Sequence, residues 1–219
     1  MSTYENLHGK RVNVVSANPS NPGDGEVWYN STLGQLKAVI PTSTGAWASG
    51  GSLPAGRQYA GLAGIQTAAI FAGGQSPSTF NTNTSYTYDG SSWTSTPALQ
   101  VDRRQAAMMG TQTSALLAGS GTSPPSTAIT ASEEWDGSNW SVAGVINTAR
   151  YGNFSGGIQT AAVIAGGSGP SVYFDDTEEY NGTAWTSVTN MPGNQGGGTS
   201  GADLQTDMYC VAGGPGNKT

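Results

Sequence analysis

The sequence of 219 residues has a formal net charge of −6, only 10% charged residues and 36% hydrophobic residues, and its few scattered lysines and arginines argue against nucleic-acid binding. Its 33 glycines, six tryptophans and nine tyrosines favour short strands joined by tight turns over disorder, because disordered chains of such polarity are usually rich in charge and poor in aromatics. Apolar stretches of about eight residues are too short for a bilayer span, and the N-terminal residues lack the apolar core of a secretion signal, so neither membrane insertion nor export is expected.

Residues 1–46 are predicted to form a separate N-terminal segment, because they do not follow the period of the rest of the chain. A short strand near residues 11–15 is followed by a loop rich in proline, asparagine and glycine, and then by the hairpin "EVWYNSTLGQLKAVI". This segment is expected to serve attachment or ring closure. The candidate packing residues of the hairpin are Val27, Tyr29, Leu36 and Val39.

From residue 47 the sequence repeats with a period of 46 to 47 residues. The phrase "GIQTAAIFAGG" (64–74) returns in similar form at 110–120 and 157–167, and more loosely at 203–214. The predicted units are 47–92, 93–139, 140–184 and a partial unit, 185–219. The positions that keep the period are Arg57, Arg104 and Arg150, Gly73, Gly74, Gly119, Gly166 and Gly167, and Trp93, Trp140 and Trp185, a series that begins at Trp47.

Each unit contains four strand-sized pieces, which in the first unit are "YAGLAG", "TAAIFAGG", "TSYTYDG" and "SWTSTPAL". The Asp-Gly or Asn-Gly after the third piece predicts a two-residue hairpin, because both residue types tolerate a positive φ. The glycine pair ends the second strand, where a Cβ would obstruct the turn of the backbone. Four antiparallel strands, repeated around an axis, describe a blade of a β-propeller.

An arginine, an apolar strand ending in Gly-Gly, a Tyr-Asp and then a tryptophan together resemble the kelch repeat. The resemblance covers roughly residues 47–185, and departs at Ser120 in place of glycine and at Trp135 in place of tyrosine. It implies an all-β, kelch-like β-propeller with three full blades and partial blades at both ends. The repeated arginines are expected to bond backbone carbonyls between neighbouring blades, and the tryptophans to be buried between sheets. The fold itself does not specify a function.

The two ends of the repeat region look complementary, because the last unit supplies only two strands before the sequence stops. An open propeller exposes sheet edges that invite pairing. Two arrangements remain open. The leading hairpin can complete a fourth blade within one chain, or several copies can pool partial rings into a larger homo-oligomeric propeller.

No catalytic, metal or cofactor motif stands out, so an enzyme and a bound cofactor are not expected. His8 and Cys210 carry no signal of a nucleophile–base pair, and Cys210 is expected to be a buried thiol. The densest acidic cluster is "DDTEE" (175–179). Its carboxylates can be read as calcium ligands or as charges that defend a solvated strand edge. These carboxylates are Asp175, Asp176, Glu178 and Glu179, with Glu133 and Glu134 at the equivalent place in the preceding unit.

A second resemblance rests on "GEVWYNSTLGQLKAV", followed by "GAWASGGSLP" and the glycine-, alanine- and threonine-rich units. This arrangement is similar to bacteriophage tail-fibre and other virion structural proteins, in which a related hairpin introduces the repeat; Leu33 stands where threonine is more usual. The resemblance implies a non-enzymatic virion protein of the tail or particle surface, assembled in the host cytoplasm. Its expected partners are other virion proteins and copies of itself.

The loops after the glycine pairs, 75–85, 121–132 and 168–177, differ in sequence while the units around them repeat. Such loops on a rigid scaffold are the usual place for recognition, although they can equally be tolerated surface variation. The alternative function is therefore a receptor- or glycan-binding module for the host surface. Its candidate contact residues are Phe80, Tyr173 and Phe174.

Overall fold

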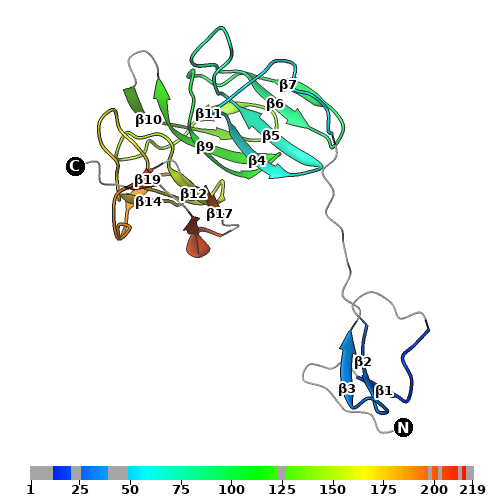
Figure 1. Cartoon of the computed structure of the whole chain (residues 1–219). Coiled ribbons are helices and arrows are strands. Elements are labelled where there is room, and N and C mark those ends of the chain that lie inside the picture. The colour runs from blue at the N-terminus through cyan, green and yellow to red at the C-terminus, as the bar shows by residue number, and fades with distance from the viewer. Residues whose placement is uncertain are drawn as a thin grey trace. The chain divides into compact units, whose positions relative to one another are not determined.

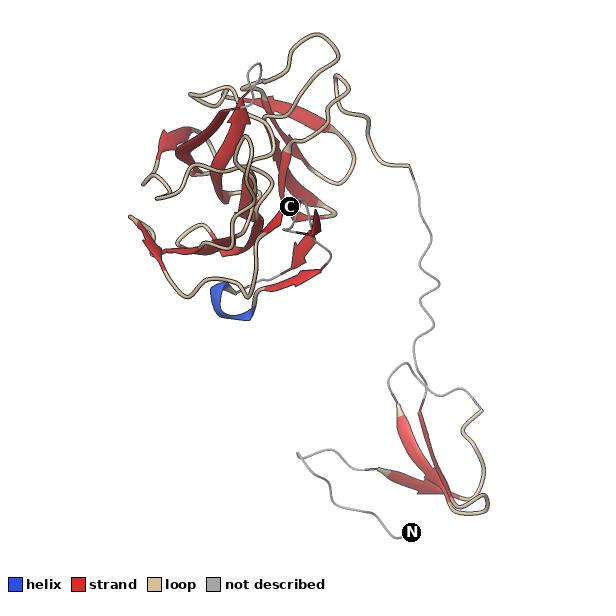
Figure 2. Cartoon of the chain, turned by 60° about the vertical axis from the view of Figure 1, so that its left-hand side comes forward, coloured by secondary structure: helices blue, strands red, loops and turns tan. Residues whose placement is uncertain are grey.

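The structure, a computed structural model, divides the chain into two compact units, Met1–Ser49 and Gly50–Thr219. It describes residues 12–20, 26–38, 49–122, 127–196, 199–201, 204–211 and 214–215. These residues form strands and loops with one 3-10 turn, η1 (Gln205–Asp207), so the expected all-β class is confirmed (Figure 2). Over the same residues, no helix has the length and apolar character that a membrane crossing requires.

The N-terminal unit contains a three-stranded sheet. Its strands are β1 (Asn13–Val15), β2 (Val27–Asn30) and β3 (Gln35–Ala38). β2 and β3 form the expected hairpin, with residues 31–34 as its turn, and β1 adds to β2 in parallel.

The buried face of this hairpin is opposite to the predicted one. Val27 and Leu36 are exposed, whereas Trp28 and Asn30 are only 5% and 3% exposed. Asn18 lies over this face and accepts hydrogen bonds at its Oδ1 from Trp28 Nε1 (3.3 Å) and Asn30 Nδ2 (2.8 Å). The polar loop after β1, which the alternation of residues did not anticipate, therefore selects the buried face. Of the other two predicted packing residues, Tyr29 is half-buried and Val39 lies outside the described residues.

The repeats form three four-stranded antiparallel sheets, and in each sheet the strands follow chain order (Figure 1). Four antiparallel strands in each sheet confirm the strand pattern predicted from the period, although the fourth strand of each sheet begins just after the predicted units 47–92, 93–139 and 140–184 end. The first sheet contains β4 (Gly61–Ile65), β5 (Ala68–Ala72), β6 (Ser85–Tyr88) and β7 (Trp93–Thr96). The second contains β8 (Ala107–Thr111), β9 (Ser114–Thr122), β10 (Thr127–Trp135) and β11 (Trp140–Val142). The third contains β12 (Phe154–Ile158), β13 (Ala161–Ala165), β14 (Thr177–Tyr180) and β15 (Trp185–Ser187).

The trailing strands after the third sheet are β16 (Gln195–Gly196), β17 (Thr199–Gly201), β18 (Tyr209–Val211) and β19 (Gly214–Pro215). β17 pairs antiparallel with β18, and β16 with β19. By the period, β17 and β18 correspond to β12 and β13, the first two strands of a unit.

The sheets stack through their first strands: β4 packs beside β8, β8 beside β12, and β12 beside β17. Main-chain hydrogen bonds also join the segments just before these first strands, since Gln105 N donates to Tyr59 O (2.7 Å) and Gly152 N to Gln105 O (2.9 Å). A buried apolar cluster fills each space between full sheets. The first holds Ala63, Ile70, Ala72 and Leu99 together with Met108, Ala115, Leu117, Trp135 and Trp140. The second holds Ala107, Met109, Leu116, Ala118 and Ile146 together with Ala162, Ile164, Tyr180 and Trp185.

The hairpins between the third and fourth strands differ from the predicted two-residue turn. In the first sheet Tyr88 pairs with Trp93, so four residues separate the paired positions. Only Gly90 takes a positive φ (93°). The Asp89 carboxylate instead accepts the backbone N–H groups of Ser91 and Ser92, both at 2.8 Å. Asp136 and Asn181 do the same in the other two sheets. The acidic or amide side chain thus closes the turn as a hydrogen-bond acceptor, not by adopting a positive φ.

The glycine pairs lie where one repeat meets the next. Gly166 has a φ of 60°, and a Cβ at this position would lie 2.5 Å from Gln195 O. Gly73 and Gly119 are placed in the same way, against the carbonyl oxygens of Arg103 and Arg150. Ser120 stands in for the second glycine of its pair, and its Oγ bonds Arg104 N and Arg104 O.

Candidate functional site

Two buried ion pairs hold the connections between repeats. Arg103 Nη2 lies 2.5 Å from Glu133 Oε1, and Arg150 Nη2 lies 2.6 Å from Glu178 Oε1, with all four side chains at most 1% exposed. Burial lowers the pKa of both arginines, because it disfavours the charged form, and the facing glutamate opposes that shift.

The two glutamates also accept backbone hydrogen bonds from the preceding connection. Glu178 accepts Asn147 N (2.6 Å) and Thr148 N (3.1 Å). Glu133 accepts Gln100 N and Val101 N in the same way. Because each carboxylate bonds an arginine and main-chain donors, we assign these ion pairs a structural role in joining the repeats.

The repeated arginines bond the third strand region of their own repeat. Arg150 Nη1 donates to Asp176 O (2.8 Å) and Arg103 Nη1 to Ala131 O (3.0 Å). Of two adjacent arginines, Arg103 makes the contacts that correspond to those of Arg150, whereas Arg104 donates to Gln75 Oε1 in the preceding repeat (3.1 Å). Arg57 has no acidic partner among the described residues and donates to Thr84 Oγ1 (3.2 Å).

The acidic residues of the cluster 175–179 differ in burial. Glu178 is 0% exposed and pairs with Arg150, so the predicted solvated strand edge is wrong for this residue, as it is for Glu133. Glu134 accepts the hydroxyl of Tyr180 from the next repeat (2.8 Å), and burial together with this bond raises the pKa of Tyr180 to about 12. In the part of the chain that the structure describes, no three acidic, histidine or cysteine side chains gather as a metal site.

The repeated tryptophans each pair with an aromatic residue directly across the hairpin. The ring centroids of Trp140 and Trp135 are 5.4 Å apart, and those of Trp185 and Tyr180 are 5.1 Å apart. Trp140 and Trp185 are both 6% exposed, whereas Trp93 is only half-buried.

Glutamines at the tips of the first hairpins clamp each sheet to the preceding one. Gln159 Nε2 donates to Trp135 O (2.9 Å) and Ala115 O (3.3 Å) of the second sheet. Gln112 bonds Tyr88 O and Ala69 O in the same way, and Gln205 bonds Tyr180 O and Ala162 O. These glutamines belong to the repeated phrase at 64–74, 110–120, 157–167 and 203–214, but the phrase carried no indication of their role.

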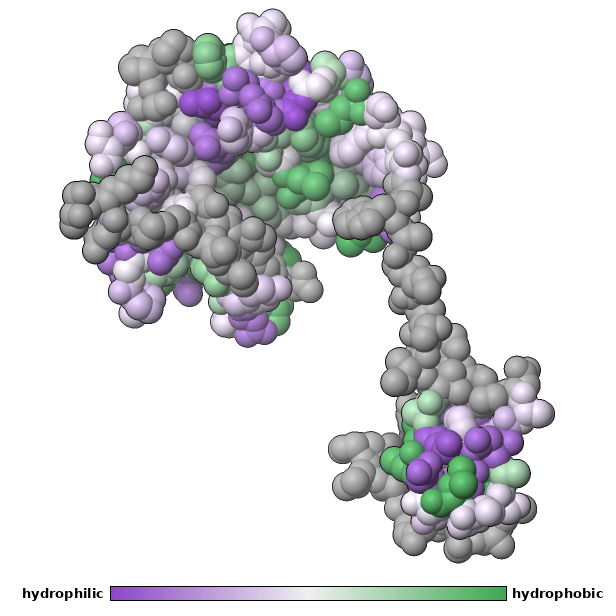
Figure 3. Space-filling model, in the orientation of Figure 1, coloured by the Kyte–Doolittle hydropathy of each residue, from purple (hydrophilic) through white to green (hydrophobic). Residues whose placement is uncertain are grey.

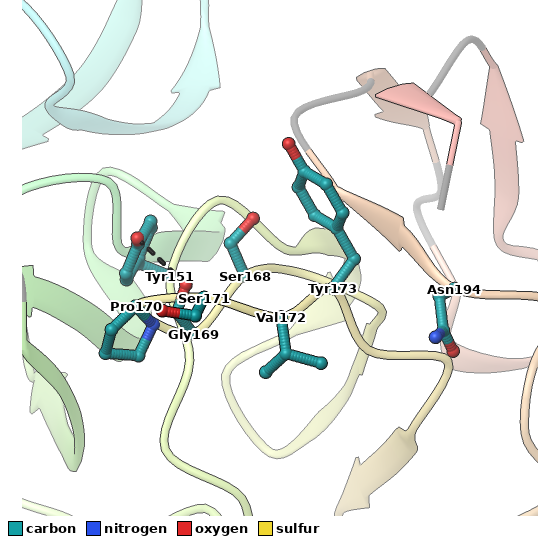
Figure 4. A pocket seen from close by; sticks show the side chains of 8 residues that line it. All are labelled: Tyr151, Ser168, Gly169, Pro170, Ser171, Val172, Tyr173 and Asn194. Atoms are coloured by element: carbon teal, nitrogen blue, oxygen red, sulfur yellow. Dashed lines mark hydrogen bonds between the residues drawn. The ribbon is translucent and has the colours of Figure 1, made fainter. Parts of the chain in front are cut away.

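The candidate binding site is a pocket of about 450 Å³ beside the loop that joins β13 to β14. The lining residues are Tyr151, Ser168, Gly169, Pro170, Ser171, Val172, Tyr173 and Asn194. Figure 4 shows Tyr151 and Tyr173 on either side of Ser168, and the hydroxyl of Tyr151 donates to Gly169 O (3.1 Å). The lining is uncharged and offers aromatic rings, hydroxyls and an amide, which suits a neutral polar ligand.

Of the predicted contact residues, only Tyr173 lines this pocket. Phe174 is half-buried next to it, and its backbone bonds Gly167 O and Gln195 N. Phe80 is 52% exposed on the corresponding loop of the first repeat. The middle loop was predicted over 121–132, but residues 121–122 and 127–132 belong to β9 and β10 and residues 123–126 lie outside the described part.

The remaining candidates for chemistry do not come together in the described residues. Cys210 lies on β18 and is exposed, which corrects the prediction of a buried thiol. His8 falls outside the described residues.

Comparison with models of protein families gives no match, and comparison with curated proteins finds no similar sequence.

Proposed function

We propose that the chain is a non-enzymatic structural protein of a bacteriophage particle, a tail-fibre or surface component whose repeats form a kelch-like β-propeller. One observation supports the propeller arrangement: β4, β8, β12 and β17 lie side by side in chain order. The main-chain bonds from Gln105 to Tyr59 and from Gly152 to Gln105 follow the same line. Blades arranged around an axis are expected to have their first strands as neighbours in this way.

The particle role is supported by the N-terminal hairpin, whose sequence resembles those that introduce repeats in phage tail fibres. The residue that departs from the resemblance, Leu33, is 54% exposed in the turn between β2 and β3. Its side chain is not fixed by packing, so the departure leaves the hairpin intact. The buried ion pairs and glutamine clamps fit a rigid part, because they use their polar groups to hold repeats together.

Mass spectrometry of purified phage particles that carry this gene tests the role. The chain is expected as a stable component, in hundreds of copies for a surface or filament protein and in a handful for a tail appendage. A chain that lacks residues 1–30 is expected to fold its repeats and to be lost from the particle. Absence of the full chain from particles made by a producing host contradicts the proposal.

The pocket beside Tyr173 favours a second candidate function, binding of a host-surface saccharide. Uncharged aromatic rings with nearby hydroxyl and amide groups suit sugar faces and their hydroxyls. Tyr173→Ala is expected to reduce particle adsorption without preventing assembly. Phe80→Ala is a matched control, because Phe80 was also a predicted contact residue and lies on the corresponding loop of another repeat, but it does not line the pocket. Equal adsorption of particles carrying either variant and of the wild type contradicts this candidate.

A further inference from the structure

The first sheet presents a face that is covered in the other two sheets. We call Leu62, Gln66, Phe71, Tyr88 and Trp93 the leading face. By the period, these positions correspond to residues that pack against the preceding sheet elsewhere: Leu62 to Met108, Phe71 to Leu117, Tyr88 to Trp135 and Trp93 to Trp140.

Burial at these positions differs between the first sheet and the later ones. Leu62 is 59% exposed, whereas Met108 is 9% exposed. Phe71 is half-buried, whereas both Leu117 and Ile164 are 0% exposed. The surface over β4 and β5 accordingly carries apolar patches in the space-filling view (Figure 3).

Gln66 is the hydrogen-bonding member of this face. The other three glutamines of the series each bond two carbonyl oxygens of the preceding sheet. Gln66 is exposed, and among the described residues its amide has no such acceptor. One edge of the face is covered by the segment of the same chain that precedes the first sheet, since Trp93 Nε1 donates to Gly51 O (3.0 Å). Leu62 and Gln66 remain open.

Among the described residues, the trailing strands also expose a position that is buried in the earlier repeats. Cys210 precedes Gly213 by three residues, as Ile70, Leu116 and Val163 precede the glycines of their own repeats. Those three residues are 0%, 0% and 3% exposed, and Ile70 and Leu116 lie in buried clusters shared with the following sheet. Cys210 is exposed on β18.

We propose that the leading face of one copy receives the trailing strands β17 and β18 of a second copy. The proposal deepens the proposed function by naming a partner, and rests on its stacked-sheet scaffold. The contact would reproduce the one that this chain already makes between its first and second sheets and between its second and third. A second copy is the fitting occupant because the leading face and the exposed Cys210 on β18 are the two halves of that contact.

Among the described residues of the repeats, the leading face does not receive β17 and β18 of the same chain. β17 packs along β12, and Leu62 stays 59% exposed although it belongs to the same compact unit. A head-to-tail contact of this kind is heterologous, so it produces either a closed ring or an open filament.

Cross-linking of the purified full-length chain tests the proposal directly. Cys210 is the only natural cysteine, and Leu62→Cys places a second thiol at the position equivalent to Met108. Ile70 and Met108, the internal counterparts of Cys210 and Leu62, belong to one buried cluster. A short bis-maleimide is therefore expected to link Cys210 of one copy to the new cysteine of the next, giving covalent dimers and larger species on a denaturing gel.

The controls separate the possible results. Val142→Cys is the matched variant, because Val142 is 69% exposed on the outer strand β11, and it is expected to give only background linking. Leu62→Cys combined with Cys210→Ser is expected to lose the dimers. A cross-link within one chain, seen by mass spectrometry as a cross-linked species with the mass of a single chain, overturns the proposal in favour of self-closure. Linking no stronger than that of Val142→Cys overturns it as well.

Light scattering gives a second measurement without cross-linking. The wild type is expected to exceed the monomer mass as concentration rises. Leu62→Asp is expected to weaken this association roughly tenfold or more, because an unpaired carboxylate would be buried in the contact, and Val142→Asp is expected to leave it unchanged. A monomeric wild type at all concentrations overturns the proposal. These results are independent of whether particles contain the chain, so the proposed function and this inference can fail separately.

Discussion

Individual polar side chains in this chain mostly bond main-chain groups, and the buried glutamates are the clearest case. Glu178 is held by Arg150, Asn147 N and Thr148 N, all within 3.1 Å. These donors satisfy the hydrogen-bonding capacity of the buried carboxylate. Removal of Arg150 would leave the buried Glu178 carboxylate without an opposite charge beside it.

Arg150→Met is expected to lower the free energy of unfolding by about 3–5 kcal/mol, because it leaves Glu178 charged and buried. Arg150→Met combined with Glu178→Gln is expected to recover much of the loss, since the amide oxygen still accepts the two main-chain bonds. Urea unfolding of the two single variants and the double variant measures the coupling. A single variant that unfolds like the wild type contradicts this account.

The turn carboxylates Asp89 and Asp136 predict a dependence on pH. Backbone N–H donors, from Ser92 first and then Ser91, hold the pKa of Asp89 below its ordinary value of 3.8, and Asn139 and Ser138 act likewise on Asp136. A lowered pKa in the folded state contributes stability above the ordinary pKa, and that contribution is lost as the pH falls through the folded-state pKa.

We therefore expect the melting temperature of the wild type to fall on acidification below about pH 4, and the variant Asp89→Asn/Asp136→Asn to fall less steeply. Asn181 already fills the same turn position in the third sheet with an amide, so the fold accepts this change. Asn181→Asp is the converse variant and is expected to steepen the acid dependence. Identical profiles for all these variants contradict the assignment.

At the scale of elements, the junctions between repeats depend on close backbone approach. Gly166 combines a positive φ with a Cβ position only 2.5 Å from Gln195 O. Gly152 has a similar φ, 61°, with nothing near its Cβ position. The corresponding residues Tyr59 and Gln105 also adopt positive φ (59° and 54°), which demonstrates that the conformation alone is tolerated.

Gly152→Ala is expected to cost about 1–2 kcal/mol of stability from backbone conformation alone. Gly166→Ala is expected to cost about 1–3 kcal/mol more, because the added methyl group must displace the main chain of residue 195. Denaturant unfolding of both variants measures the difference. Equal losses contradict the role of close approach at the glycine pair.

The glutamine clamps give a second prediction about the junctions. Gln159→Met is expected to cost about 1–3 kcal/mol, because Trp135 O and Ala115 O lose their donor. Gln66→Met, the equivalent change on the leading face, is expected to stay within about 0.5 kcal/mol in the monomer. Thermal and urea unfolding at low protein concentration compare the two. A large loss at Gln66 in the monomer indicates an acceptor within the same chain.

The period of the sequence predicted the elements better than their contacts. Four strands per unit followed from alternation and glycine spacing, because both are local properties. The choice between Arg103 and Arg104 could not follow, since the period varies between 46 and 47 residues and leaves an uncertainty of one position. The exposure of Cys210 could not follow either, because it depends on what packs against β18 and not on the local sequence pattern.

At the scale of the whole molecule, the same contact recurs between successive sheets. We expect cryo-electron microscopy of the assembled protein to show the sheets arranged radially, with β4, β8 and β12 nearest the axis. Sheets packed face to face as a two-layer sandwich would contradict the propeller.

The glutamine clamps and the glycine junctions share a property with an evolutionary consequence. Both approach carbonyl oxygens of the neighbouring repeat: the glutamines donate to them, and Gly74 N and Gly167 N donate to Arg103 O (2.8 Å) and Gln195 O (2.7 Å). Every amino acid supplies a carbonyl oxygen whatever its side chain. An in-frame duplication of about one unit would therefore bring a working junction with it, before any side chain had adapted. A lineage of such genes can lengthen or shorten its product by whole units while its surface loops diverge freely.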